Sequence, residues 1–180
     1  MRILRNIPSE GTVPLRALTT ASWRVEPEEG AVIFDGRDGA TIVIEGKLCY
    51  TLDDRGKASR FSRSADVPAR LERIYSEVGK EGFSDRVEGD YVAAVVEKMH
   101  DRVEVFGDAL GRRTIFYLES GYPRISTDFY DLLPHLGEIV HDPAVIYCIL
   151  VLSYAPAKHT PYRGLRRLAT GERLRASGGK

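Results

Sequence analysis

Few side chains in this sequence have the type and spacing that site chemistry requires. His135 and His141 are the closest pair among the four histidines, but they flank a predicted turn, where a solvated loop is a commoner meaning than a metal site. The acidic stretch from 81 to 90, next to two glycines, is more typical of a solvated connection than of a catalytic carboxylate pair. The sequence therefore predicts no metal site and no acid–base pair of its own.

Three hydroxyl side chains, Thr19, Thr20 and Ser22, fall within four residues of one another. A hydroxyl at a newly formed N-terminus can act as a nucleophile, with its own α-amino group as the base. Cleavage before one of these residues would create such a group. A loop rich in Thr and Ser is the commoner meaning of the same letters.

The overall composition excludes several classes of protein. Twenty-six basic and 26 acidic residues cancel, so the chain lacks the charge expected of a nucleic-acid or membrane-surface binder. Cys49 and Cys148 lie within apolar stretches and are expected to be buried. The apolar segment 144–155 is about half as long as a membrane-spanning helix. We therefore expect a cytoplasmic protein with no nucleic-acid or membrane partner.

Runs of β-forming residues predict antiparallel strands. Residues 31–52 alternate such runs with Asp-Gly and Glu-Gly pairs, which are typical of hairpin turns. Residues 90–108 give two strands around a polar hinge at 98–102, and residues 114–127 give two more, joined at Ser120-Gly121. The first thirty residues lack a sustained period, and we expect one short strand and loops there.

Helical spacing follows three aspartates. Asp66 is the expected N-cap of a helix that ends at Gly79, and a short helix is expected at 128–137 behind Asp128. Residues 142–154 open with Asp-Pro and predict a mostly buried helix, after which the tail to residue 180 is expected to fray. Strands with a few helices predict an α+β domain.

The segment VFGDALGRRTIFYL places a polar turn between two β-type runs. Asp108 can accept backbone N–H groups beside the tight turn at Gly111 and so hold that turn. Arg112 and Arg113 are expected to emerge at the end of the sheet, most simply as solvated side chains.

The order of these segments resembles the N-terminal domain of the asparagine synthetase family, a class II glutamine amidotransferase domain with an N-terminal-nucleophile (Ntn) hydrolase fold. The resemblance is carried by GDALGRRTIFY (107–117), by the strand and hinge of 85–108 with Gly89 at the family's glycine, by TDFYDLL (127–133), and by 142–174, which resembles the bridge into the synthetase domain. It covers roughly residues 41–175. It implies stacked antiparallel sheets flanked by helices (αββα), with a glutaminase-type domain at 1–140 and a C-terminal helix and tail at 141–180.

The resemblance also implies a substrate pocket that has lost its chemistry. Glu45-Gly46-Lys47 resembles the family's Asn-Gly-Glu, in which the Asn amide donates to the oxyanion and the Glu holds the substrate's ammonium. A carboxylate at Glu45 repels an oxyanion, and a cation at Lys47 repels an ammonium. Asp66 matches the family's Gly-Ser-Asp aspartate, although a helix N-cap explains it equally well. The degenerate pocket would thus comprise Glu45, Gly46, Lys47 and Asp66.

The family's nucleophile, the thiol of the first residue, is also missing, because neither Met1 nor Arg2 carries a thiol or hydroxyl. The resemblance implies a catalytically inactive domain or subunit of an asparagine-synthetase-like, ATP-dependent amide-forming enzyme, with a structural or docking role. ATP and Mg²⁺ are expected only on a separate synthetase domain, which would be the partner, and a homodimer is possible.

Two other functions stay open at this point. One is an active Ntn amidohydrolase, exposed by processing between Thr19 and Ser22. The other is a small-ligand sensor that reuses Glu45 and Lys47. The apolar segment 144–155 lies towards the synthetase domain in the resembled proteins, and an exposed partner-binding face and a plain core are equally compatible with its sequence.

Overall fold

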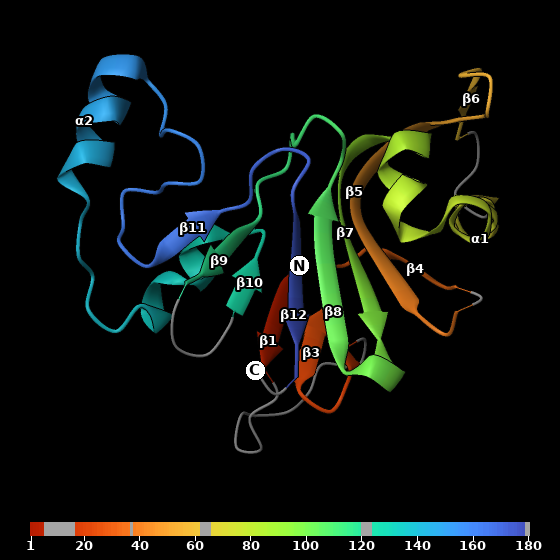
Figure 1. Ribbon diagram of the computed structural model, residues 1–180, viewed down its shortest axis with the longest axis horizontal. Coiled ribbons are helices and arrows are strands. Elements are labelled where there is room, and N and C mark those ends of the chain that lie inside the picture. Colours follow the sequence, from red (N-terminus) through yellow and green to blue (C-terminus); the bar gives the residue numbers. More distant parts are fainter. Residues whose placement is uncertain (6–16, 37, 62–65, 120–123, 179–180) are drawn as a thin grey trace.

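Two antiparallel β-sheets stack face to face in the computed structural model, which describes residues 1–5, 17–36, 38–61, 66–119 and 124–178 (Figure 1). The first sheet contains, in spatial order, β11 (Leu165–Arg167), β9 (Phe116–Leu118), β10 (Arg124–Ser126), β1 (Arg2–Arg5), β3 (Trp23–Glu26) and β2 (Leu18–Thr19). The second contains β12 (Arg173–Ser177), β8 (Arg102–Gly107), β7 (Val87–Glu97), β5 (Thr41–Leu52) and β4 (Val32–Asp35), and β6 (Ala58–Arg60) pairs with β5. We call them sheet A and sheet B.

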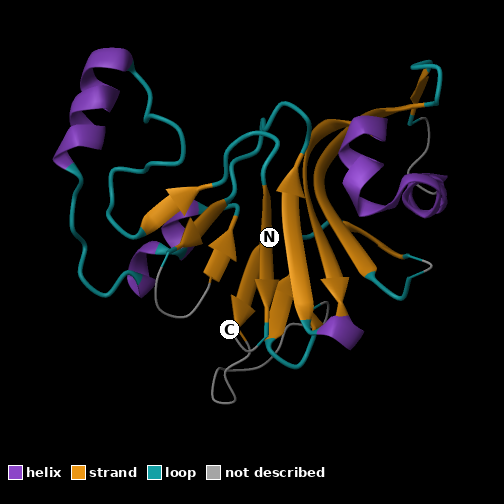
Figure 2. Cartoon of the chain, viewed as in Figure 1, coloured by secondary structure: helices purple, strands orange, loops and turns teal. Residues whose placement is uncertain are grey.

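Helices are few, and they differ in how they pack. Helix α1 (Val67–Arg86) covers the face of sheet B that points away from sheet A, whereas α2 (Pro143–Leu152) projects from the far side of the molecule (Figures 1 and 2). Three 3₁₀ turns complete the described elements, namely η2 (Lys98–His100), η3 (Phe129–Asp131) and η4 (Leu133–His135). Mixed helix and antiparallel sheet confirm the predicted α+β class.

The central strands of sheet B are buried on both faces. Ile42 and Ile44 of β5 pack towards α1, while Val43 between them packs towards sheet A. Side chains of a strand alternate between its faces, so this period of two divides the apolar residues between two cores. The same rule directs Glu45, two residues after Val43, into the layer between the sheets.

The predicted Glu-Gly turn at residues 45 and 46 is wrong, because β5 runs without interruption over 12 residues. Gly46 lies opposite Tyr91 of β7 and has a φ of +121°. A Cβ atom there would lie 2.1 Å from the carbonyl oxygen of Asp90. Glycine is therefore needed at this position for the close approach of two strands and not for a change of direction.

Helix α1 begins and bends at the predicted residues, with two corrections. Asp66 precedes it, but within the described part of the chain its side chain makes no capping hydrogen bond. Gly79 leaves the helical conformation, with a φ of 66° and a ψ of −175°, and the helix then resumes up to Arg86, where a solvated connection was expected. Leu71 and Ile74 are buried against sheet B, as the helical spacing predicts.

Both ends of the described chain contribute to the sheets. Strand β1 pairs with β3 on one side and β10 on the other, so the N-terminal segment holds an interior strand of sheet A and not only a short strand and loops. Strand β11 joins sheet A, and β12 joins sheet B beside β8. The tail expected to fray is thus ordered as far as β12.

Two further predictions about helices fail in instructive ways. Residues 128–137 form η3 and η4 and no α-helix, although Asp128 does accept from the Tyr130 N–H as an N-cap. Asp142 caps α2 as predicted, by accepting from two backbone N–H groups, but of the ten described residues of that helix only Val145 is buried. The predicted junction at Ser120-Gly121 lies outside the described residues.

Cys49 is exposed, contrary to expectation, and Cys148 is partly buried. No helix in the described ranges is both long enough and apolar enough to cross a membrane.

Candidate functional site

The α-amino group of Met1 lies between the two sheets, beside the carboxylate of Glu45. Its nitrogen is 2.6 Å from Glu45 Oε2, and the two side chains are 1% and 2% exposed. Strand β1 brings Met1 into sheet A, and the alternation of β5 turns Glu45 towards it. A buried charge of either sign is costly unless it is paired, so each of these groups provides what the other requires.

Two further groups complete the surroundings of this ion pair. The Met1 ammonium donates to Thr127 Oγ1 at 2.7 Å and lies 3.3 Å from Glu28 Oε1, whose side chain is 56% exposed. Glu45 Oε1 accepts from the Glu28 backbone N–H at 2.7 Å. Both oxygens of the Glu45 carboxylate therefore have a positive or donating neighbour.

This arrangement has little capacity for acyl-transfer chemistry. The side chain of Met1 is an apolar thioether packed into the core between the sheets, so it offers no nucleophile. The α-amino group, which is the base in an N-terminal-nucleophile mechanism, is engaged here in an ion pair with the Glu45 carboxylate. The Glu45 carboxylate beside this amine is a hydrogen-bond acceptor, whereas an oxyanion is stabilised by donors.

Of the four residues predicted as a degenerate pocket, Glu45, Gly46 and Lys47 are consecutive on β5, and Asp66 lies apart from them. Glu45 lies between the sheets, but Gly46 and Lys47 are exposed beyond it on β5. Asp66 is exposed at the start of α1, which packs on the opposite face of sheet B. The sequence placed Glu45 among pocket residues but did not identify Met1, Glu28 or Thr127 as its neighbours.

The turn after β8 is held by Asp108, in the manner expected from the sequence. Its buried carboxylate accepts from the backbone N–H groups of Leu110 at 3.0 Å and Arg112 at 3.1 Å. Gly111 has a φ of +60°, and a Cβ there would lie 2.5 Å from Thr170 Oγ1. Arg112 is exposed but not free, because its guanidinium donates to the Gly89 carbonyl at 2.6 Å.

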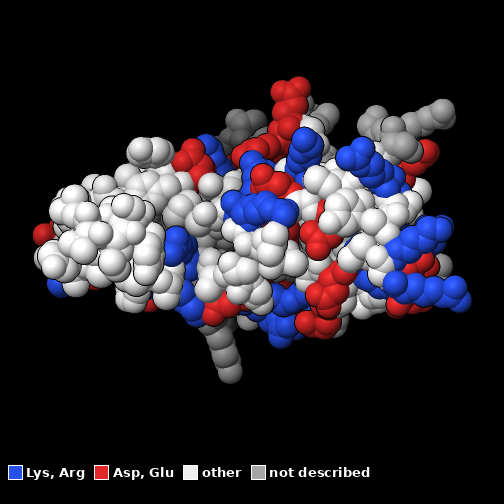
Figure 3. All heavy atoms as spheres, turned by 90° about the horizontal axis from the view of Figure 1, so that it is seen from above, with Lys and Arg blue, Asp and Glu red and all other residues white. Residues whose placement is uncertain are grey.

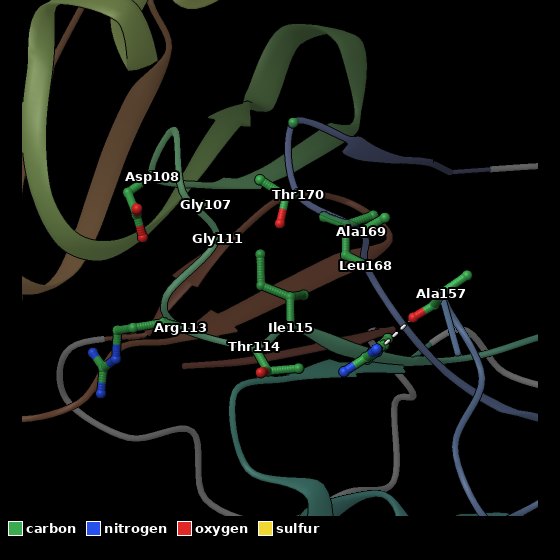
Figure 4. A pocket seen from close by; sticks show the side chains of 12 residues that line it. Gly107, Asp108, Gly111, Arg113, Thr114, Ile115, Ala157, Leu168, Ala169 and Thr170 are labelled. Carbon is green, nitrogen blue, oxygen red and sulfur yellow. Dashed lines mark hydrogen bonds between the residues drawn. The ribbon is translucent and has the colours of Figure 1, made fainter. Parts of the chain in front are cut away.

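A cavity of about 270 Å³ lies between this turn and the turn that precedes β12. Figure 4 shows Ile115 and Thr170 facing each other across it, while Asp108 lies to one side, at its own turn. Arg167, which also lines the cavity, donates to the carbonyls of Ala155 and Ala157 at 2.5 Å. Asp108 and Arg167 thus hold loops in place, which is a structural use of charged groups.

A second buried carboxylate, Glu104, lies on the other face of sheet B, towards α1. Lys80 and Arg173 approach it at 3.3 Å and Arg175 at 3.0 Å. Burial alone would raise the pKa of Glu104, but the hydrogen bond and charge of Lys80 and the charge of Arg175 outweigh it and lower that pKa below its ordinary value of 4.5. This cluster joins β8, β12 and the second part of α1.

Two of the three hydroxyls proposed as nucleophiles after processing, those of Thr20 and Ser22, are hydrogen-bonded. Thr20 and Ser22 both donate through their hydroxyls to the Asp101 carboxylate, each at 2.6 Å, and the Ser22 backbone N–H donates to it at 2.8 Å. Asp101 lies after η2, in the left-handed conformation with a φ of 45°. These contacts join the β2–β3 turn of sheet A to the β7–β8 turn of sheet B.

Within the described ranges, no group of three or more His, Cys, Asp or Glu residues could hold a metal ion. Compared with known proteins, the chain matches no family model and no curated sequence.

Proposed function

We propose that this chain is a catalytically inactive, glutamine-amidotransferase-like domain or subunit of an asparagine-synthetase-like enzyme that forms amides with ATP. Its role would be structural or docking. The observation that carries the proposal is the pairing of the Met1 ammonium with the buried Glu45 carboxylate. In the family that the sequence resembles, the nucleophile and the oxyanion donor are expected at these two positions.

Glutamine hydrolysis by an Ntn enzyme needs a nucleophile, a base and a donor to the oxyanion. Met1 provides a thioether in place of the first and a paired ammonium in place of the second, and Glu45 provides a negative charge in place of the third. The last two replacements are linked, because the Met1 ammonium and the Glu45 carboxylate neutralise each other in a buried site. Such a pocket is suited to holding the two sheets together.

Processing before Thr19 is disfavoured on structural grounds. It would remove β1, which lies between β3 and β10 in sheet A. It would also remove the Met1 ammonium and leave Glu45 buried without its counter-ion, at a cost of about 3–5 kcal/mol. An active hydrolase formed in this way would lose an interior strand and a core charge pair.

The test uses the chain with an affinity tag at its C-terminus, because Met1 is buried. The purified chain is incubated with glutamine, and the ammonia released is compared with that of a buffer blank. The tagged chain is also captured from its native cell extract and the bound material is identified by mass spectrometry. We expect no ammonia above the blank, and a bound protein or attached domain that carries a Ser-Gly-Gly-x-Asp-Ser loop and consumes ATP in forming an amide.

Ammonia release by the chain alone would overturn the proposal. So would an intact mass that lacks the first eighteen residues together with hydrolase activity, since that combination identifies the processed enzyme. Recovery of the chain with no ATP-dependent partner would favour a sensor. That reading predicts a rise in unfolding temperature with an amino acid or nucleotide.

A further inference from the structure

A cavity of about 590 Å³ lies between α1 and the hairpin formed by β5 and β6. We call it the hairpin cavity, and its volume is within the range of small-molecule binding sites. The lining includes four basic and three acidic residues, namely Lys57, Arg70, Arg73, Arg86, Asp53, Asp54 and Glu77. Figure 3 shows Lys and Arg side chains gathered at the end of the molecule where α1 and β6 lie. The hairpin cavity therefore has a positive excess.

The three carboxylates that line the hairpin cavity already have partners. One oxygen of Asp53 accepts from two backbone N–H groups of the hairpin turn, at 2.9 Å and 2.8 Å. Asp54 forms an ion pair with Arg86, and Glu77 lies 4.0 Å from Arg73. The acidic residues are thus engaged in holding the turn or in ion pairs, and they do not account for all the basic residues.

Arg70 is a cation that is held in place by uncharged groups. Its guanidinium donates to the Thr51 hydroxyl, to the Ser59 carbonyl at 2.8 Å and to the Arg60 carbonyl at 2.9 Å. It also lies over the Phe61 ring, with Cζ 4.9 Å from the ring centroid. A guanidinium has five N–H donors, so two donors and the positive charge are left for a further acceptor. An arginine fixed in this way loses little conformational entropy when it binds an anion.

Lys57 and Arg73 approach the hairpin cavity from opposite sides, one from the hairpin turn and one from α1. Within the described ranges Lys57 forms no ion pair. The side chain of Arg73 is 72% exposed, and its contact with Glu77 is a surface pair that costs little to break. Both side chains are therefore able to turn towards an anion that Arg70 holds.

The ligand that fits these three cations is an anion with several oxygens. A phosphoryl group carries about two negative charges and three acceptor oxygens at pH 7, and a planar guanidinium binds two of those oxygens at once. The hairpin cavity is also larger than a phosphate ion, and Leu52, Ala58 and Ile74 give it an apolar part.

We infer that the hairpin cavity binds a small molecule that carries a phosphoryl group. Arg70 holds the phosphoryl oxygens, Lys57 and Arg73 bind them from either side, and the uncharged part of the molecule contacts the apolar lining. This inference goes beyond the proposed function and does not rest on it. The hairpin cavity lies on the α1 side of sheet B, whereas Glu45 lies on the side that faces sheet A.

The test measures the binding of inorganic phosphate, AMP and ribose 5-phosphate by isothermal titration calorimetry. AMP and ribose 5-phosphate distinguish a nucleotide from a sugar phosphate, and adenosine and ribose are the matched compounds without a phosphoryl group. The chains compared are wild type, Lys57→Gln, Arg73→Gln and the double variant. Lys98→Gln is the control, because Lys98 is exposed on η2 and outside the hairpin cavity. Urea midpoints establish that all variants fold like the wild type.

We expect one site for at least one phosphorylated probe and no binding of adenosine or ribose. Lys57→Gln and Arg73→Gln are each expected to raise the Kd by about tenfold, because each removes a charged hydrogen bond to the phosphoryl group, whereas Lys98→Gln leaves the Kd unchanged. No binding of any phosphorylated probe would overturn the inference. Binding of adenosine as tight as that of AMP would also overturn it.

Two further outcomes would assign binding elsewhere and so overturn the inference. AMP binding that persists in the double variant but is lost in Lys47→Gln would belong to the pocket of a sensor that uses Glu45 and Lys47. Binding of a short single-stranded RNA that is tighter than binding of AMP, and is lost in the double variant, would assign this surface to a nucleic acid. None of these results bears on the proposed function, which requires no ligand in the hairpin cavity.

Discussion

Glu45 and Glu104 are two buried carboxylates on opposite faces of the same sheet, and they are neutralised in different ways. Glu45 faces sheet A and pairs with the Met1 ammonium, which is as deeply buried as Glu45 itself. Glu104 faces α1 and pairs with Lys80, Arg173 and Arg175, whose side chains all reach solvent to some extent. The first pair is closed to water, and the second is a buried anion under a partly hydrated set of cations.

The stability lost when a buried carboxylate is removed therefore depends on the burial of its charged partner as much as on the burial of the carboxylate itself. If Glu104 is lost, flexible Lys and Arg side chains can turn their charged ends towards water. If Glu45 is lost, the Met1 ammonium is fixed by β1 and cannot reach water without moving an interior strand. Four variants or conditions test this comparison.

The largest effect is expected for Glu45→Ala. It leaves a buried ammonium with Thr127 and the more distant Glu28, and removal of one partner from a buried ion pair costs about 3–5 kcal/mol in the free energy of unfolding. Urea unfolding measures the loss. The control is Glu28→Ala, expected to cost less than about 1 kcal/mol because Glu28 is exposed. Equal midpoints for the two variants would show that Glu45 is not the counter-ion of Met1, and Glu45→Gln serves if the alanine variant does not fold.

A smaller loss, about 1–3 kcal/mol, is expected for Glu104→Gln, because the cations it leaves behind can rehydrate. The measurement is the same urea titration. Glu77→Gln is the control, since Glu77 forms an exposed pair with Arg73 at 4.0 Å on α1. A loss as large as that of Glu45→Ala would remove the distinction between the two sites.

The decrease in the free energy of unfolding at low pH provides a second measurement of the contribution of the Glu104 cluster. The lowered pKa of Glu104 means that the folded chain keeps this carboxylate charged where the unfolded chain already binds a proton. Its contribution is therefore complete above the ordinary value of 4.5 and disappears as the pH falls through the lower folded pKa. We expect urea midpoints between about pH 3 and 7 to fall less steeply for Glu104→Gln than for wild type, and parallel curves would count against this role.

Thr127→Val is expected to have the smallest effect, about 1 kcal/mol, because it removes one hydrogen bond from the Met1 ammonium and leaves Glu45 in place. Thr19→Val, at an exposed position of β2, is the matched control. Thermal unfolding of the two variants side by side gives the difference. A Thr127→Val loss equal to that of Glu45→Ala would mean that the hydroxyl, and not the carboxylate, holds the amine.

The two helices show what local sequence pattern can and cannot predict. Both starts were predicted, because the Asp-Pro signal of α2 and the apolar spacing of α1 act over one helical turn. The sequence predicted that α2 is mostly buried and left an exposed face over 144–155 open as the alternative, because apolar composition does not distinguish the two; the helix is in fact mostly exposed. The turn at Asp108 was predicted because its acceptor and donors lie within four residues.

The candidate site was only half predictable. The sequence singled out Glu45, yet it grouped that residue with Lys47, which is exposed two residues further along β5, and with Asp66, which lies at the start of α1. It read Gly46 as a turn, because a glycine that permits two strands to approach looks the same in sequence as one that reverses the chain. The contact of Met1 with Thr127 spans 126 residues, so no local pattern reports it.

By itself the sequence determined the alternating strands, the helix starts and the Asp108 turn, because each depends on residues within a few positions of one another. The tertiary structure alone decided that Met1 meets Glu45, that Lys80 meets Glu104, and that α2 stays exposed. These outcomes depend on how the sheets stack and on where α1 packs. The pairing of a buried charge and the burial of an apolar helix both depend on contacts between segments that are far apart in the chain.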